Sequence, residues 1–263
     1  MYRRFTPTFK QPRCHVSFNL PRRYLSFTEL QTRQQYLDYC HKNNVDTESH
    51  VFKGTFYEVH VREFLEREFF CKNLVRVGGA YDQGIDIIGN WNLLRYYNDE
   101  SLSSRINAKS ILKSAKESRL NTSKRPISLE NDINVLVQCK NLRTKPSTKI
   151  IRELVGMASF QQPNNKTNNT FIFIVTPLPG TPAACAQIEA THIPVIHLIL
   201  RPLMNFNKND VSYFNADSWT NGGHLESVYM NIAARSRLSG LNIEDHVKYL
   251  IKGINPLKEQ DKR

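Results

Sequence analysis

Polar side chains occupy two short apolar runs in which buried strands are expected. Asp86 lies within the isoleucine-rich run 85–88, and Gln138 and Lys140 lie at the end of the run 135–140. Short β-branched runs predict strands, and alternate residues of a strand share one face, so Gln138 and Lys140 point the same way. An unpaired lysine in a protein interior is costly or gives up its proton. We therefore expect Lys140 either to lie in water at a strand end or to face Asp86.

An acid on one strand beside an amide and a lysine on the next is the set of groups that metal-assisted hydrolysis of a phosphodiester needs. Glu58 is a second candidate acid, since it lies in the first turn of a helix expected to begin at Gly54. Its carboxylate could instead favour the positive end of the helix dipole. Asp86 also has a structural alternative, that of a buried aspartate satisfied by hydrogen bonds. The sequence leaves these alternatives open.

The elements around these residues follow in the order helix, three strands, helix, strand, helix and strand. Their expected ranges are 54–70, 74–77, the run that contains Asp86, 135–140, 149–161, 171–175, 181–190 and 194–199. The run 171–175 is continuously apolar, which is typical of a strand covered on both faces. This order predicts an α/β protein with a three-layer α/β/α core around a mixed central sheet.

We divide the chain into four parts. They are an import sequence over 1–26, a helical extension over 27–52, the α/β domain over 53–200 with an insertion over 91–132, and a C-terminal helical cover over 201–263. In the cover, helices are expected over 224–235 and 243–251.

The net charge favours a polyanionic partner. The chain of 263 residues has a formal charge of +12, a pI near 9.5 and 40% hydrophobic residues, which indicates a folded core with a preference for nucleic acid. Six of the basic residues lie within 1–28, where no acid occurs, and without them the charge falls to +6. That segment is typical of a mitochondrial transit peptide. The alternative is a basic arm that contacts nucleic acid.

Composition argues against a protein held together by disulfides or zinc, and against a membrane-spanning protein. The five cysteines are isolated and odd in number, which argues against a disulfide framework or a zinc knuckle and favours a reducing compartment. No apolar run approaches the ~20 residues that span a bilayer. We therefore expect no membrane span, and the oligomeric state is left undetermined.

Basic residues gather in the insertion and after the Gln138 strand. Between 101 and 129 there are seven basic residues and one acid, and four of the seven recur at helical spacing. Such a face could follow a phosphate backbone, or it could be the solvated face of an insertion. The candidate nucleic-acid contacts are Arg105, Lys109, Lys113, Lys116, Arg143, Lys145, Lys149 and Arg152.

The ordered motifs over about 53–200 resemble a known family. They are Gly54-x-x-Tyr57-Glu58, Gly79-x-x-Asp82-x-Gly84-Ile85-Asp86, Val137-Gln138-Cys139-Lys140, Arg152-Glu153-Leu154-x-Gly156 and Val175-Thr176. This array resembles the Mrr-type restriction-endonuclease-like branch of the PD-(D/E)XK nuclease superfamily. With its basic N-terminus, the chain is similar to the fungal mitochondrial proteins required for respiratory growth that carry this domain.

The resemblance implies a role for each candidate residue. Asp86 would bind Mg²⁺ or Mn²⁺ together with the backbone carbonyl of Cys139, and Gln138 would replace the acid of the usual motif. Lys140 would orient the attacking water or offset charge on the phosphate, and Glu58 would supplement the metal site. Gln138 is neutral where many members carry a carboxylate, so this site holds fewer negative charges, although the Mrr branch accepts glutamine there.

The leading hypothesis is a metal-dependent nuclease that acts on DNA in the mitochondrial matrix, in genome maintenance and respiratory growth. A nuclease-fold protein that binds nucleic acid or a mitochondrial complex without cutting is the alternative. A matrix structural factor with no nucleic-acid contact is a third. It would require the basic residues of 101–152 to be dispersed over the fold.

Overall fold

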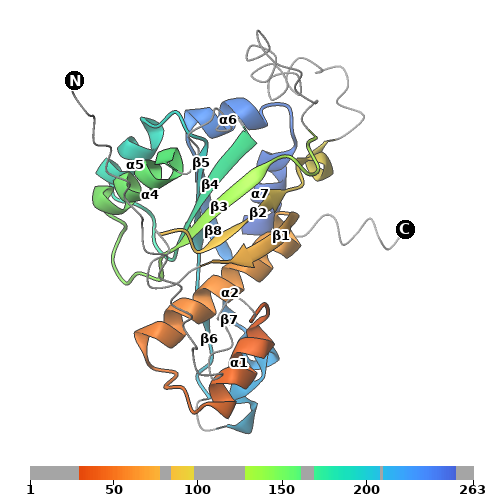
Figure 1. Cartoon of the computed structure of the whole chain (residues 1–263), viewed down its shortest axis with the longest axis vertical. Helices are drawn as coiled ribbons and strands as arrows, with labels where there is room; N and C mark the ends of the chain where they lie inside the picture. Colours follow the sequence, from red (N-terminus) through yellow and green to blue (C-terminus); the bar gives the residue numbers. More distant parts are fainter. Residues whose placement is uncertain (1–29, 78–83, 98–127, 161–168, 208–209, 253–263) are drawn as a thin grey trace, which may run out of the picture.

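A mixed six-stranded sheet forms the centre of the protein (Figure 1). The computed structural model describes residues 30–77, 84–97, 128–160, 169–207 and 210–252. In spatial order, the strands are β1 (Cys71–Arg76), β2 (Ile87–Trp91), β3 (Asn134–Cys139), β4 (Thr170–Thr176), β5 (Val195–Leu200) and β8 (Leu225–Met230). Strands β3, β4 and β5 are parallel, and the outer strands pair antiparallel.

Helices cover both faces of this sheet. On one face lie α4 (Thr148–Phe160) and α5 (Pro182–Glu189), whose residues Ile151 and Ile188 pack against β4 and β5. On the other face lie α2 (His50–Glu68), α6 (Ile232–Leu238) and α7 (Ile243–Ile251), which enclose the largest core cluster. The three-layer α/β/α arrangement with a mixed sheet is thereby confirmed.

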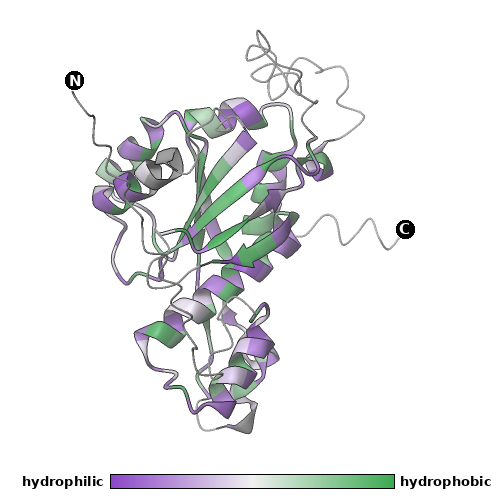
Figure 2. Ribbon diagram, viewed as in Figure 1, coloured by the Kyte–Doolittle hydropathy of each residue, from purple (hydrophilic) through white to green (hydrophobic). Residues whose placement is uncertain are grey.

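The hydropathy of the chain explains these layers. Every residue of β4 is buried, as expected for a strand covered on both faces. Hydrophobic residues are concentrated in the strands, and hydrophilic residues in the outer parts of the helices (Figure 2). Helix α5 begins at the predicted place, because Thr181 accepts a hydrogen bond from the backbone of Ala184 and Pro182 stands in the first turn.

The prediction of a helix over 224–235 is wrong. Residues Leu225–Met230 instead form β8, which pairs antiparallel with β5 and ends the sheet, and α6 begins only at Ile232. Gly222 and Gly223 adopt φ values of 85° and 68°, so they turn the chain into the strand rather than into a helix. The C-terminal segment therefore supplies a strand as well as helices.

The N-terminal extension packs against a distant part of the chain. Helix α1 (Arg33–Lys42) and the first half of α2 form a second core cluster with residues 213–219, beside the short strands β6 (Leu203–Met204) and β7 (Asn221–Gly222) (Figure 1). Trp219 packs against both Phe52 and Phe56, with ring centroids 6.0 and 4.5 Å away. The described residues of segments 30–52 and 201–222 thus form one unit.

The start of the expected insertion belongs to the core. Trp91 ends β2, and Leu93 and Tyr96 lie in a 3₁₀ turn, with all three side chains buried. The indole of Trp91 and the hydroxyl of Tyr96 both donate to the carbonyl of Phe69. Only residues 98–127 of the expected insertion lie outside the described residues.

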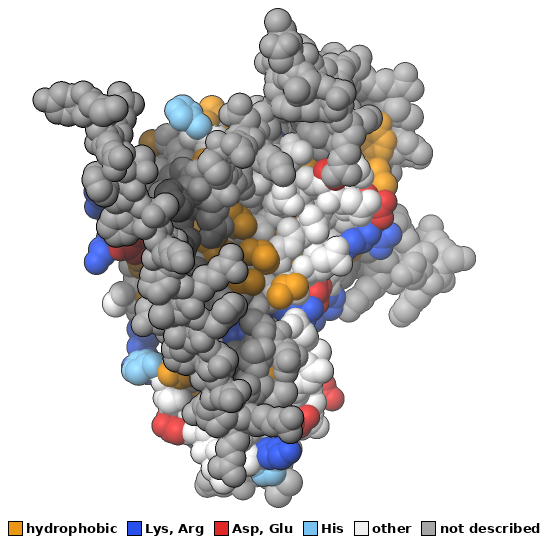
Figure 3. Space-filling view, viewed as in Figure 1, with side chains coloured by type: hydrophobic (Ala, Val, Ile, Leu, Met, Phe, Trp, Pro, Cys, Tyr) orange, Lys and Arg blue, Asp and Glu red, His pale blue; other side chains and the backbone are white. Residues whose placement is uncertain are grey.

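One face of the β1–β2 pair is partly exposed. Val75 and Ile88 are register partners, and their exposed fractions are 43% and 39%. Hydrophobic side chains also appear at the middle of the surface seen in Figure 3. Across the described residues, no helix has the length and apolar character needed to cross a bilayer.

Asn231 joins three elements where β8 meets α6. Its fully buried side chain accepts hydrogen bonds from the backbone of Val195 and Ala234. Its two amide hydrogens are shared among three carbonyl groups at the end of α5 and in the α5–β5 connection. It is also the N-cap of α6. A side chain of any other size or polarity would leave several buried backbone groups without partners.

We predict that Asn231→Ala lowers the free energy of unfolding by about 3 kcal/mol, because a cap and several buried hydrogen bonds are lost together. Asn242→Ala is the matched control, since Asn242 is the exposed N-cap of α7 and makes no side-chain cap bond. Its expected loss is under about 0.5 kcal/mol. Urea unfolding measures both values, and equal losses would contradict the prediction.

His197 on β5 is a buried neutral histidine. Its Nε2–H donates to Thr176 Oγ1 at 2.7 Å, since the hydroxyl hydrogen of Thr176 is already donated to the carbonyl of Leu178. Burial lowers the pKa of His197 from its ordinary value of 6.5 to about 4. Below pH 6.5 the unfolded chain therefore binds a proton that the folded chain does not.

Consequently, stability should fall as the pH drops from 6.5 towards 4. We predict that the loss of unfolding free energy between pH 7 and pH 5 is about 2 kcal/mol smaller in His197→Gln than in the unmodified protein. Glutamine keeps an amide donor for Thr176 and does not titrate. Urea unfolding at the two pH values gives the difference, and identical losses would refute it.

Candidate functional site

Asp86 and Gln138 meet between β2 and β3. The Asp86 side chain is buried, and its Oδ2 accepts hydrogen bonds of 2.6 Å from Gln138 Nε2 and 2.6 Å from the backbone N–H of Cys139. The backbone of Asp86 is fixed from both sides, since its carbonyl accepts from Val77 N–H and its own N–H donates to Val137. Neighbouring strands thus bring together the acid and the amide that the sequence singles out.

The amide nitrogen of Gln138 lies between two oxygen atoms. Besides Asp86, it donates to the carbonyl of Cys139 at 3.3 Å, and the Gln138 residue is only 2% exposed. These two oxygens belong to the residues that the resemblance assigns as metal ligands. They therefore converge on one point at the carboxyl end of β3, the end at which ligands bind in open α/β sheets.

Lys140 follows the last residue of β3. Its backbone N–H donates to the carbonyl of Val175 on β4, and its side chain is partly exposed. Across the described residues, it forms no ion pair with Asp86 or with another acid. Of the two alternatives for Lys140, the structure thus favours the strand end in contact with water.

Glu58 and Arg76 form an ion pair close to this point. Arg76 Nη2 donates to Glu58 Oε2 at 2.7 Å, and the exposed fractions of the two side chains are 4% and 20%. Glu58 is not in the first turn of its helix, because Ser49 caps α2 nine residues before it, so the helix-dipole alternative is wrong. The carboxylate of Glu58 instead forms an ion pair with the guanidinium of Arg76.

Sequence reasoning missed Arg76. The signal was present, since Arg76 is a charged residue in a short apolar run, the same argument that selects Lys140. The residue lies on β1, directly before Val77, whose N–H binds the carbonyl of Asp86.

Four charged groups influence the pKa of the Cys139 thiol. Burial raises the pKa of this thiol, the carboxylates of Asp86 and Glu58 raise it further, and Arg76 and Lys140 oppose them. Among the described residues, two acids and two bases therefore act on the pKa of this one buried thiol in opposite directions, and Arg76 is the one of the four that the sequence analysis did not select.

The oxygen atoms suit a hard cation in part. Mg²⁺ and Mn²⁺ prefer carboxylate, carbonyl and amide oxygens, and Asp86 and Cys139 present two of these to one point. Within the described ranges, no three His, Cys, Asp or Glu side chains form a metal-binding group. An ion would thus depend on the Cys139 carbonyl and on the oxygen of the Gln138 amide, with Glu58 available only after it leaves Arg76.

The expected nucleic-acid contacts divide into two groups. Arg143, Lys145, Lys149 and Arg152 are exposed and follow Lys140 through the connection to α4 and its first turns. Lys149 lies 3.9 Å from Glu153 in an exposed pair. The other group consists of Arg105, Lys109, Lys113 and Lys116, and it lies outside the described residues.

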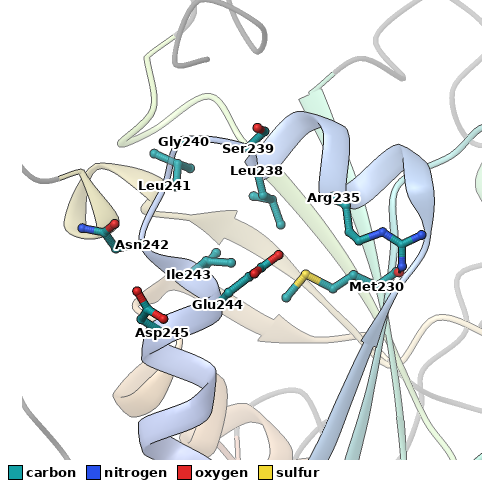
Figure 4. A pocket seen from close by; sticks show the side chains of 10 residues that line it. All are labelled: Met230, Arg235, Leu238, Ser239, Gly240, Leu241, Asn242, Ile243, Glu244 and Asp245. Carbon is teal, nitrogen blue, oxygen red and sulfur yellow. The ribbon is translucent and has the colours of Figure 1, made fainter. Parts of the chain in front are cut away.

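A pocket of about 430 Å³ lies elsewhere, between α6 and α7 (Figure 4). Met230 contributes to it from the end of β8, together with Arg235 of α6 and Glu244 of α7. Met230 pairs with Ile196 near the start of β5, whereas Asp86 and Gln138 lie at the carboxyl end of β3. The pocket and the candidate site are therefore at opposite ends of the sheet.

The fold and the site define an α/β protein with a buried acid–amide pair at the carboxyl end of a parallel strand. The chain belongs to the family Required for respiratory growth protein 7, whose family model matches residues 49–238. This range includes every described residue of the acid–amide site. The resemblance to respiratory-growth proteins is thereby confirmed, whereas the nuclease resemblance stays a prediction.

Three relatives carry the name Required for respiratory growth protein 7, mitochondrial. The protein of Vanderwaltozyma polyspora is 31% identical over 76% of this chain and 80% of its own length. That of Candida glabrata is 30% identical over 86% and 90%, and that of Saccharomyces cerevisiae strain YJM789 is 27% identical over 87% and 93%. No solved structure matches the chain.

We predict that Glu58 and Arg76 are strongly coupled. A double-mutant cycle with Glu58→Gln and Arg76→Met should give a coupling free energy above about 1.5 kcal/mol, since the guanidinium is buried. The control pair is Lys72 and Glu130, both 44% exposed and 2.8 Å apart, for which we expect a much weaker coupling because solvent screens the two charges. Unfolding in urea measures both cycles, and similar values would show that burial adds nothing.

Proposed function

We propose that this protein is a metal-dependent phosphodiester hydrolase that acts on DNA in mitochondria and supports respiratory growth. One observation carries the proposal. The carboxylate of Asp86 and the carbonyl of Cys139 converge at the Gln138 amide, and Lys140 follows directly after the last residue of β3. The names of the relatives support the mitochondrial and respiratory part.

Each residue has a role that its position allows. Asp86, the Cys139 carbonyl and the Gln138 amide oxygen would hold Mg²⁺ or Mn²⁺. When bound, such an ion polarises the phosphate and lowers the pKa of its water. Lys140 is partly exposed and bound to no acid among the described residues, so its ammonium group is available to orient that water or to offset charge on the phosphate.

The basic connection after β3 supports a nucleic-acid substrate. Arg143, Lys145, Lys149 and Arg152 are exposed and come directly after Lys140 in the chain. Exposed cations of this kind bind the phosphate backbone, whatever the sequence, with an affinity that falls steeply with salt. The basic segment over 1–28 supports import into the matrix.

A second function is favoured by the Glu58–Arg76 pair. The guanidinium of Arg76 already forms an ion pair with the carboxylate of Glu58, which would otherwise supplement the metal site. Gln138 adds no charge of its own. A site neutralised in this way suits a nuclease-fold protein that binds nucleic acid or a mitochondrial complex without cutting it. Binding without cutting is therefore the alternative.

We predict that the full chain nicks supercoiled DNA with Mg²⁺ or Mn²⁺, and that chelation by EDTA stops the reaction. Asp86→Asn and Lys140→Met should each reduce the rate by about 100-fold or more, because they remove an ion ligand and a group that offsets charge. Lys72→Met is the control, since Lys72 is an exposed lysine near the start of β1, paired with Glu130. Its rate should be unchanged.

Binding is measured on the same proteins. If Asp86→Asn and Lys140→Met cut as fast as the unmodified protein, the assigned site is wrong. If no variant cuts and all bind DNA with a steep salt dependence, the binding-only function is correct.

A further inference from the structure

The acid–amide contact has a fixed direction. An ionised carboxylate only accepts hydrogen bonds, and the carbonyl of Cys139 does the same, so the nitrogen end of the Gln138 amide must face both of them. The oxygen end then points away from the place where an ion would bind. Bulk solvent has little access to the nitrogen, since Gln138 is 2% exposed.

The nitrogen takes the place of a cation in this arrangement. It donates to the same two oxygens that a metal ion would need, at 2.6 Å and 3.3 Å. Rotation of the amide by half a turn about its last side-chain bond would exchange nitrogen for oxygen at almost no change in shape. Two acceptors and a third oxygen would then face one point, an arrangement that a hard cation stabilises.

We propose that Gln138 is a neutral latch on the ion site and sets its affinity. The inference rests on the proposed function, because it takes the ion site as given. Without an ion, the amide nitrogen holds the Asp86 carboxylate and the Cys139 carbonyl. An ion must break both hydrogen bonds and turn the amide, so glutamine keeps the folded site stable when it is empty and makes ion binding weak.

Gln138→Glu tests the latch, because glutamate has the same shape and no N–H to donate. Its carboxylate would face that of Asp86, so the two charges repel each other in a buried place. We expect the melting temperature without divalent ions to fall by at least about 4 °C. Mg²⁺ or Mn²⁺ alone should restore it, with half-saturation at a concentration at least about 10-fold lower than in the unmodified protein.

Two control variants separate the causes. Gln34→Glu makes the same exchange in an exposed place, where Gln34 Nε2 donates to Asp38 at 2.7 Å, and it should show no added response to ions. Gln138→Met removes the hydrogen bonds without adding charge. It should be destabilised, and Mg²⁺ or Mn²⁺ should stabilise it no more than they stabilise the unmodified protein.

The measurements are thermal unfolding and calorimetric titration of the full chain with MgCl₂ or MnCl₂. If Gln138→Glu is as stable as the unmodified protein without ions, or if ions fail to restore it, the latch is refuted. If ions restore it and no variant cleaves DNA, the latch holds and the proposed hydrolase activity fails. The two proposals are therefore tested separately.

Discussion

The buried carboxylate of Asp86 is the constraint on which this structure depends. A charge in that position is tolerated because two N–H groups of β3 donate to one of its oxygens. Both groups come from adjacent residues, one by its side chain and the other by its backbone. A slip of one residue between β2 and β3 would turn Gln138 to the opposite face of the sheet. The register of the two strands and the chemistry of the site are therefore fixed by the same contacts.

Charge balance extends this constraint to the helix layer. Glu58 reaches the site from α2 and Arg76 from β1, and their ion pair lies close to the same cysteine as Asp86 and Lys140. Among the described residues, the two acids that act on this cysteine are matched by two bases, although the whole chain carries +12. The basic character lies instead on exposed residues such as Arg143 and Lys145. Recognition of a polyanion and the chemistry of the buried site are thus divided between separate residues.

The sequence predicts the central part of the fold well, because periodicity there is strong. The apolar runs of β3, β4 and β5 and the cap Thr181-Pro182 leave few alternatives. It fails at β8, where Glu226 and Ser227 weaken the strand pattern and pairing with β5 decides the conformation. The sequence could predict that Asp86 and Gln138 lie together, because each is a polar residue in an otherwise apolar strand. The partner of Glu58 could not be predicted, since it depends on where α2 begins and on how that helix lies over β1.

The packing of α1 against residues 213–219 has a consequence for the order of folding. The side chain of Gln34 binds the backbone of Phe214 and Ala216, about 180 residues further along the chain. Phe52 and Phe56 likewise find their tryptophan partner only at position 219. A chain that emerges from a ribosome or a translocation pore with its N-terminus first would therefore expose these rings until nearly the whole polypeptide has appeared. Until residues 213–219 arrive, the apolar faces of the first two helices lack their final partner, which is the condition under which a partly folded chain aggregates.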